Sequence, residues 1–61
     1  MIAEIQCKDL FILRSISLRA RFRKLLVESI DKYTIRITGD KDKINMCVVG
    51  TDEKVSLRYV D

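Results

Sequence analysis

The fold prediction depends on residues 17–32, SLRARFRKLLVESIDK, because their apolar positions fit partly the period of a helix and partly the alternation of a strand. As a helix, the segment begins after Ser17, a suitable N-cap, and has a single apolar stripe. The stripe consists of Leu18, Phe22, Leu25, Leu26 and Ile30. As a strand, apolar and polar residues alternate from position 16 to 22, but the alternation stops at Lys24. The helix accounts for more residues, so we predict one amphipathic helix centred on residues 22–30 and leave open helix or strand at 16–22.

The residues before this segment alternate only weakly. Positions 2–8 place Ala3, Ile5 and Cys7 on one side, which predicts a short N-terminal strand. Asp9 either ends that strand or caps a helix that follows it. Residues 10–16 contain four apolar residues in a row, and for them we favour a strand or a packed loop over a helical extension.

Three further strands are predicted in the C-terminal half, over residues 33–38, 44–49 and 55–59. β-Branched and aromatic residues dominate the first, and the second is apolar on both faces. The polar segments 39–43 and 50–54, each beginning with a glycine, predict the turns between them. We therefore expect a three-stranded antiparallel meander covered on one face by the helix, that is, a single α+β domain spanning residues 1–61.

The expected core follows from these elements. Its predicted members are Ile5, Leu18, Phe22, Leu25, Leu26, Ile30, Ile35, Ile37, Met46, Val48, Leu57 and Tyr59. Tyr33 and Tyr59 are expected to lie in the core rather than to serve as base-stacking platforms. Phe11 is the better candidate for an exposed aromatic residue, although for it too we favour burial.

The size and composition of the chain limit what it can be. Apolar residues make up 48% of its 61 residues and charged residues 34%, which fits one globular domain. A domain this small buries only about 60% of its unfolded surface, so we expect added stability from homodimer formation. The N-terminus lacks the features of a signal peptide, and no apolar run is long enough to span a membrane. The sequence predicts a cytoplasmic protein.

The sequence contains no recognisable pattern of a catalytic or metal-binding site. Histidine is absent, and Cys7 and Cys47 lie too far apart for a local metal motif. We expect both cysteines to be reduced thiols facing the core, and no disulfide. The acidic pairs Asp40–Asp42 and Asp52–Glu53 fall in predicted turns, and the first lacks the glycine and glutamate of a calcium loop. We predict no enzyme activity, no metal and no cofactor.

The distribution of charge is the clearest functional signal. All nine acidic residues lie outside positions 10–27, although the net charge is only +3. The basic residues of that run are Arg14, Arg19, Arg21, Arg23 and Lys24. They form either a solvated helix face or a surface that contacts another macromolecule.

We predict a small regulator or inhibitor that binds a partner protein through the basic helix or the edge of the sheet. The last strand is the expected open edge, which Lys54 and Arg58 would protect. The alternative is DNA or RNA binding, in which the same five basic residues neutralise phosphates. Docking of the basic helix on an anionic membrane is a third use of these residues.

Overall fold

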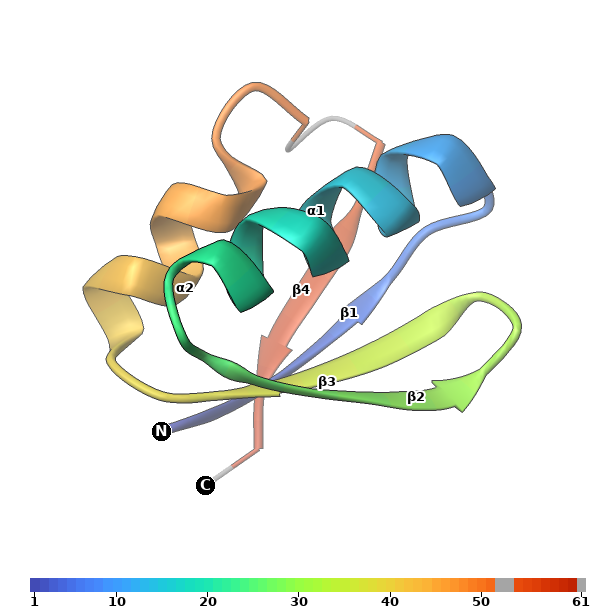
Figure 1. The fold of residues 1–61 in the computed structure, drawn as a ribbon. Helices are drawn as coiled ribbons and strands as arrows, with labels where there is room; N and C mark the ends of the chain where they lie inside the picture. The colour runs from blue at the N-terminus through green and yellow to red at the C-terminus, as the bar shows by residue number, and fades with distance from the viewer. Residues whose placement is uncertain (52–53, 61) are drawn as a thin grey trace.

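The computed structural model describes residues 1–51 and 54–60 (Figure 1). In this part of the chain the strands are β1 (Ile2–Gln6), β2 (Leu26–Asp31), β3 (Thr34–Thr38) and β4 (Ser56–Tyr59), and the helices are α1 (Leu10–Phe22) and α2 (Lys41–Val48). The strands form one antiparallel sheet in the order β2-β3-β1-β4. This is the split βαβ, or ferredoxin-like, arrangement, and it implies no function by itself.

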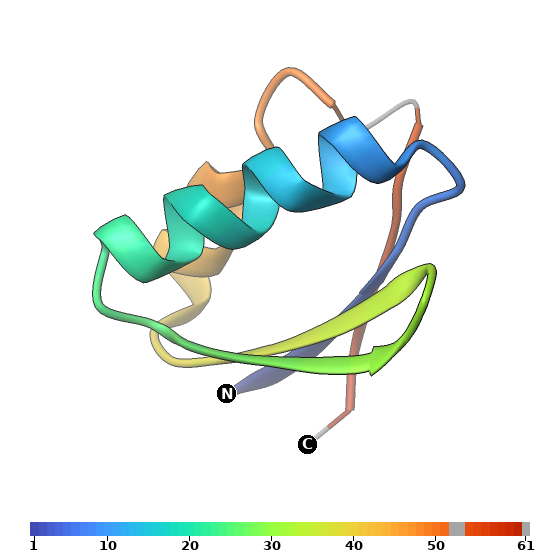
Figure 2. The same cartoon turned by 45° about the vertical axis from the view of Figure 1, so that its right-hand side comes forward.

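Both helices cover the same face of the sheet, as Figure 2 shows. Alternation along the strands turns Ala3 and Ile5 of β1, and Ile35 and Ile37 of β3, toward the helices, where they are buried. The other side chains of these strands lie on the opposite face, which we call the open face. The core therefore lies in a single layer between the sheet and the two helices.

Helix α1 begins at a well-formed N-cap. Asp9 Oδ1 accepts hydrogen bonds from the backbone N–H groups of Phe11 at 3.0 Å and Ile12 at 3.3 Å. The helix buries a narrow stripe of three residues spaced three and four apart, Leu13, Ile16 and Ala20. This cap and this buried stripe place the first residue of the helix at Leu10, eight residues before Leu18, where a helix capped by Ser17 would begin.

Helix α1 ends in a Schellman motif. Leu25 N donates to Ala20 O at 2.9 Å and Lys24 N donates to Arg21 O at 3.0 Å. Lys24 occupies the left-handed conformation that the motif requires, with φ of 62°. Leu25 is buried directly after it, so the chain turns back under the helix and enters β2.

Helix α2 is capped by Asp40, whose Oδ1 accepts from Asp42 N at 2.9 Å. It buries Ile44, Cys47 and Val48, which share one face. Its C-terminal end is held by α1, because Arg19 Nη1 lies 3.4 Å from both Cys47 O and Val49 O. A cation beside the last carbonyl groups of a helix is favourable.

The predicted class is confirmed: the chain is a small α+β domain with an N-terminal strand and a helix packed on an antiparallel sheet. The strands predicted over 2–8, 33–38 and 55–59 correspond to β1, β3 and β4. Both cysteines are buried and unpaired, as expected.

Three segments differ from the prediction. Residues 10–16 are helical rather than strand or loop, because Asp9 takes the capping role that we left as the alternative. Residues 26–31 form β2 rather than the second half of a helix, because the Schellman motif stops α1. The strand predicted over 44–49 is wrong, since α2 occupies most of it; burial of one face by the sheet outweighs the β propensity of this segment.

These shifts change the core. Ile5, Leu25, Ile35, Ile37 and Val48 are buried as predicted, and Leu57 and Tyr59 are half-buried. The predicted core residues that are instead exposed are Leu18, Phe22, Leu26, Ile30 and Met46, and Phe11 and Tyr33 are exposed as well. Cys7 and Cys47, which were expected to face the core, belong to it, and the core also includes residues that were not predicted: Ala3, Leu13, Ile16, Ala20 and Ile44.

Replacement of Lys24 by glycine tests the helix end. A non-glycine residue in the left-handed region is disfavoured by roughly 1 kcal/mol, so Lys24→Gly should raise the free energy of unfolding by about that amount in urea denaturation. Lys24→Ala is the control, because alanine keeps the Cβ atom and should change little. Equal stability of the two variants would contradict the assignment.

Candidate functional site

The outward face of α1 carries an exposed apolar stripe. Phe11 and Phe22 are each 87% exposed and Leu18 is 56% exposed. Their spacing of seven and four residues aligns them along the helix, opposite the buried stripe. We call these three residues the outer stripe. Single exposed apolar residues are ordinary, but an aligned set with two almost fully exposed phenylalanines is typical of a contact surface.

Basic residues border the outer stripe on both sides. Arg14 and Arg21 lie seven residues apart on the side of α1 that faces β2, where both line a groove. Arg19 lies on the α2 side, where it binds the end of α2. Arg23 lies on that side too, and its Nη1 donates to Arg19 O at 3.4 Å.

The five basic residues predicted as a site are therefore not brought together. Arg14 and Arg21 share one side of α1, Arg19 and Arg23 the other, and Lys24 is in the turn that ends the helix. Neither Arg14 nor Arg21 makes an ion pair with any described residue. What distinguishes these two arginines within the set is that both line a groove beside the outer stripe.

A groove of about 360 Å³ separates α1 from β2. Apolar side chains from the helix, from β2 and from β3 line it, together with three cations. Its lining residues are Leu10, Leu13, Arg14, Ser17, Leu18, Arg21, Val27, Ser29, Lys32 and Ile35. The groove thus adjoins the outer stripe through Leu18, and none of the described residues that line it is acidic.

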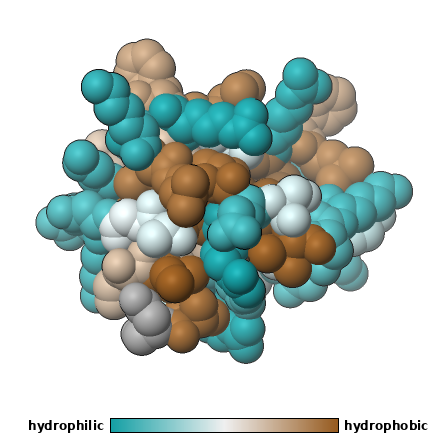
Figure 3. Space-filling view, turned by 60° about the horizontal axis from the view of Figure 1, so that its bottom comes forward, coloured by the Kyte–Doolittle hydropathy of each residue, from teal (hydrophilic) through white to brown (hydrophobic). Residues whose placement is uncertain are grey.

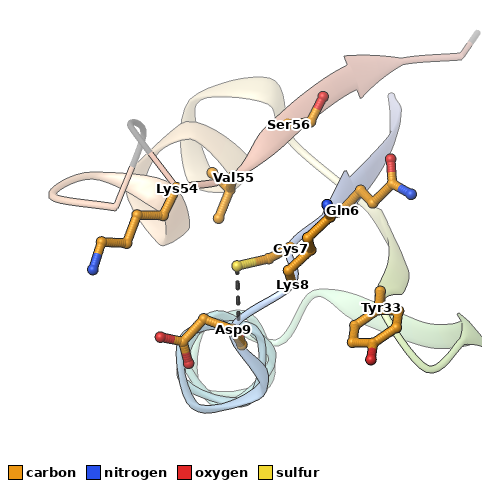
Figure 4. A pocket seen from close by; sticks show the side chains of 8 residues that line it. All are labelled: Gln6, Cys7, Lys8, Asp9, Tyr33, Lys54, Val55 and Ser56. Atoms are coloured by element: carbon orange, nitrogen blue, oxygen red, sulfur yellow. Dashed lines mark hydrogen bonds between the residues drawn. The ribbon is translucent and has the colours of Figure 1, made fainter.

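A second hollow, of about 750 Å³, lies where β1 leads into α1, beside Tyr33 and the start of β4 (Figure 4). The Cys7 thiol borders it and donates to Asp9 O at 3.4 Å. The Asp9 carboxylate caps α1 and is thereby engaged by backbone N–H groups. In the described part of the chain the Cys7 thiol thus hydrogen-bonds a backbone carbonyl group and not a side-chain base, which is the partner that a catalytic nucleophile uses.

The other groups that could take part in catalysis or metal binding have structural roles instead. Burial raises the pKa of the Cys47 thiol, against the opposite influence of Arg23 and Arg19, and the thiol donates to Lys43 O at 3.2 Å. Asp40 and Asp42 sit at the start of α2, where Asp40 is the cap. The pair Asp52–Glu53 lies outside the described residues. Over positions 1–51 and 54–60, no group of three potential ligands could hold a metal ion.

The open face of the sheet centres on an ion-pair network. Glu4 Oε2 accepts from Arg36 Nη2 at 3.0 Å, and Glu4 Oε1 accepts from Arg58 Nη2 at 2.6 Å. Hydrogen bonds from Arg36 and then from Arg58 lower the pKa of the Glu4 carboxyl. Figure 3 shows that hydrophilic side chains divide the apolar areas of this face. The open face is thus less continuous as an apolar surface than the outer stripe.

Comparisons with protein-family models, with curated proteins and with solved structures gave no match. No helix in the described part of the chain is long and apolar enough to cross a membrane. The candidate site therefore stands on its geometry alone.

The outer stripe was missed because residues 10–22 contain two apolar sets at helical spacing, and the prediction assigned the wrong set to the core. The set that packs on the sheet is at positions 13, 16 and 20, and its last member is the small Ala20. The signal that separates the two sets is Asp9, because a helix capped there places the compact set on the sheet. Lys32 was missed since it is distant in sequence from the basic run.

Acid should weaken the fold through Glu4. Its pKa is lowered in the folded state, so its contribution to stability is complete above the ordinary pKa of 4.5 and is lost as the pH falls through the folded value. We expect urea denaturation between pH 6 and pH 3 to show a smaller loss of stability for Glu4→Gln than for the natural protein. Glu28→Gln, which alters an exposed carboxylate on β2, is the control; an unchanged pH profile in Glu4→Gln would contradict this role.

Removal of the outer stripe should leave the fold intact. Because Phe11 and Phe22 are almost fully exposed, the double variant Phe11→Ser, Phe22→Ser should change the free energy of unfolding by only about 0.5 kcal/mol. Ile16→Ala, inside the core, should lower it by about 2–5 kcal/mol. Chemical denaturation of both compares them, and a large loss in the double variant would mean that these phenylalanines support the fold.

Proposed function

We propose that this protein is a non-catalytic cytoplasmic regulator or inhibitor that binds a partner protein through the outer stripe of α1. The observation that carries the proposal is the alignment of Phe11, Leu18 and Phe22 on the solvent side of a helix whose opposite side already packs on the sheet. A helix that is apolar on both faces buries the second one against another surface.

The bordering charges indicate which kind of protein fits. Arg14 and Arg21 lie along one side of the outer stripe, without an ion pair to any described residue. A partner with acidic side chains beside an apolar contact would neutralise them and gain orientation as well as affinity. The proposed partner surface is therefore apolar at its centre and acidic at its rim.

Self-association through this surface is less favourable on the same argument. Two α1 helices docked antiparallel by their outer stripes would bring Arg14 of one copy near Arg21 of the other, and such like charges repel. We therefore propose a different protein as the partner. Homodimer formation elsewhere on the molecule stays a prediction, which analytical ultracentrifugation tests.

Nucleic-acid binding through Arg14, Arg19, Arg21, Arg23 and Lys24 is the alternative. It is less supported because Arg19 binds the carbonyl groups at the end of α2 and the outer stripe separates the remaining cations. Phosphate binding through the cations of the groove alone would give a shallow salt dependence, with a log–log slope of about −3 for three contacts. A steeper slope with mixed-sequence DNA or RNA would favour the alternative.

Site-specific photocrosslinking in the cells that make the protein tests the proposal. Phe22 is replaced by benzoylphenylalanine, which preserves an exposed aromatic group, and Met46 on α2, which is 54% exposed, carries the same probe as the control. We expect an adduct with another protein from position 22, no such adduct from position 46, and loss of the adduct when Leu18→Glu is added.

Other results of this experiment would overturn the proposal. An adduct of twice the mass of the chain would show that the outer stripe binds a second copy of this protein. A nuclease-sensitive adduct would show that it binds a nucleic acid, and an adduct with lipid would show that it binds a membrane surface. Absence of any adduct at position 22, with circular dichroism unchanged, would show that the outer stripe is not an interface.

A further inference from the structure

The edge of the sheet beside the groove has unused backbone pairing capacity. Among the described strands, β2 pairs only with β3, so the backbone groups on its other side have no partner strand. An open edge strand is a template for another strand. Strand β2, LVESID, contains neither proline nor a basic residue that would protect such an edge.

Only part of this edge is regular enough to pair. The register between β2 and β3 shifts between Ser29 and Asp31, which forms a bulge close to the hairpin turn. Bulges disrupt the ladder and turn an edge away from further pairing. The stretch from Leu26 to Ser29 is the regular part, and it runs along the groove.

From these observations we propose that the groove between α1 and β2 receives an extended acidic segment of a partner protein, which adds to the sheet as a strand beside Leu26–Ser29. The inference rests on the proposed function, since it names a partner chemistry next to the outer stripe. In an extended segment alternate side chains point to the same face. One set would enter the groove beneath α1, where Leu13, Val27 and Ile35 provide an apolar lining.

The charge at the rim of the groove selects an acidic segment. Arg14, Arg21 and Lys32 line it, and no described residue forms an ion pair with any of them. Backbone pairing would supply affinity that depends little on sequence, and the three cations would favour acidic over basic peptides.

A second copy of this chain fits the groove less well. Glu28 opposes Arg36 in the register and so lies on the open face, away from the groove. If the β2 strands of two copies paired, the cations of both grooves would meet with no acidic residue of β2 between them on the helix side. Like charges across an interface disfavour that pairing.

Synthetic peptides provide the probe. An eight-residue peptide is titrated into the ¹⁵N-labelled protein; the side chains of one face are valine, glutamate, valine and glutamate in turn, so that this face offers both apolar and acidic groups to the groove, and threonine fills the positions between them. A peptide with lysine in place of glutamate is the charge control. A third peptide carries N-methyl groups on alternate amides, which removes hydrogen-bond donors but keeps the charges. We expect the glutamate peptide to bind and to slow hydrogen exchange of amides in Leu26–Ser29 that point away from β3.

Matched variants locate the binding. Arg21→Glu should weaken binding of the glutamate peptide about tenfold or more, whereas Lys43→Glu, which makes the same change of net charge on α2, should alter it less than about twofold. N-methylation should also weaken binding by about tenfold or more. Both variants are exposed substitutions, and their circular dichroism checks the fold.

Several outcomes would overturn the inference without deciding the proposed function. These are equal binding of the N-methylated peptide, equal binding of the lysine peptide, an unchanged affinity in Arg21→Glu, and unchanged exchange of the β2 amides. Each leaves the crosslinking result at position 22 standing. Conversely, peptide binding with no protein adduct at position 22 would retain the groove as a peptide site and reject the outer stripe as an interface.

Discussion

The hydrogen bond from Leu25 N to Ala20 O is the constraint on which the rest of the arrangement depends. It ends α1 and allows the next residues to become β2 instead of two more helical turns. Because the chain reverses there, β2 runs as an edge strand beside the helix that precedes it, and the groove lies between them. The same reversal leaves Phe22, the last residue of α1, directed to solvent.

Helix α1 presents two apolar sides, one that packs on the sheet and one that faces solvent. Its inner side uses Leu13, Ile16 and Ala20, and the small Ala20 permits close packing where the Schellman motif closes. Its outer stripe contributes nothing to that core. Burial of a large apolar side chain is worth roughly 1.5–3 kcal/mol, so the outer stripe holds a driving force for association that the isolated domain leaves unused. Part of that driving force offsets the loss of translational and rotational freedom on binding.

The sequence predicted the fold class and the strands that alternate clearly, such as Thr34–Thr38, because in this strand one face is buried and the other only half-buried. It did not predict the limits of α1, since Lys24 carries no local sign that it adopts a left-handed conformation usually taken by glycine. The strand assigned to residues 44–49 failed for a related reason. An apolar run without a clear period takes the structure that its neighbours require, and here α2 must cross over the sheet between β3 and β4.

The candidate site depends on three-dimensional placement that no linear pattern contains. The basic run predicted one charged face, but the helical period divides it, and Arg19 is used to hold the end of α2. Lys32, from the β2–β3 turn, joins Arg14 and Arg21 at the groove instead. This division has a consequence for specificity. An exposed apolar stripe alone would favour association between identical copies, whereas cations beside it make such contacts repulsive and leave an acidic partner as the favourable one.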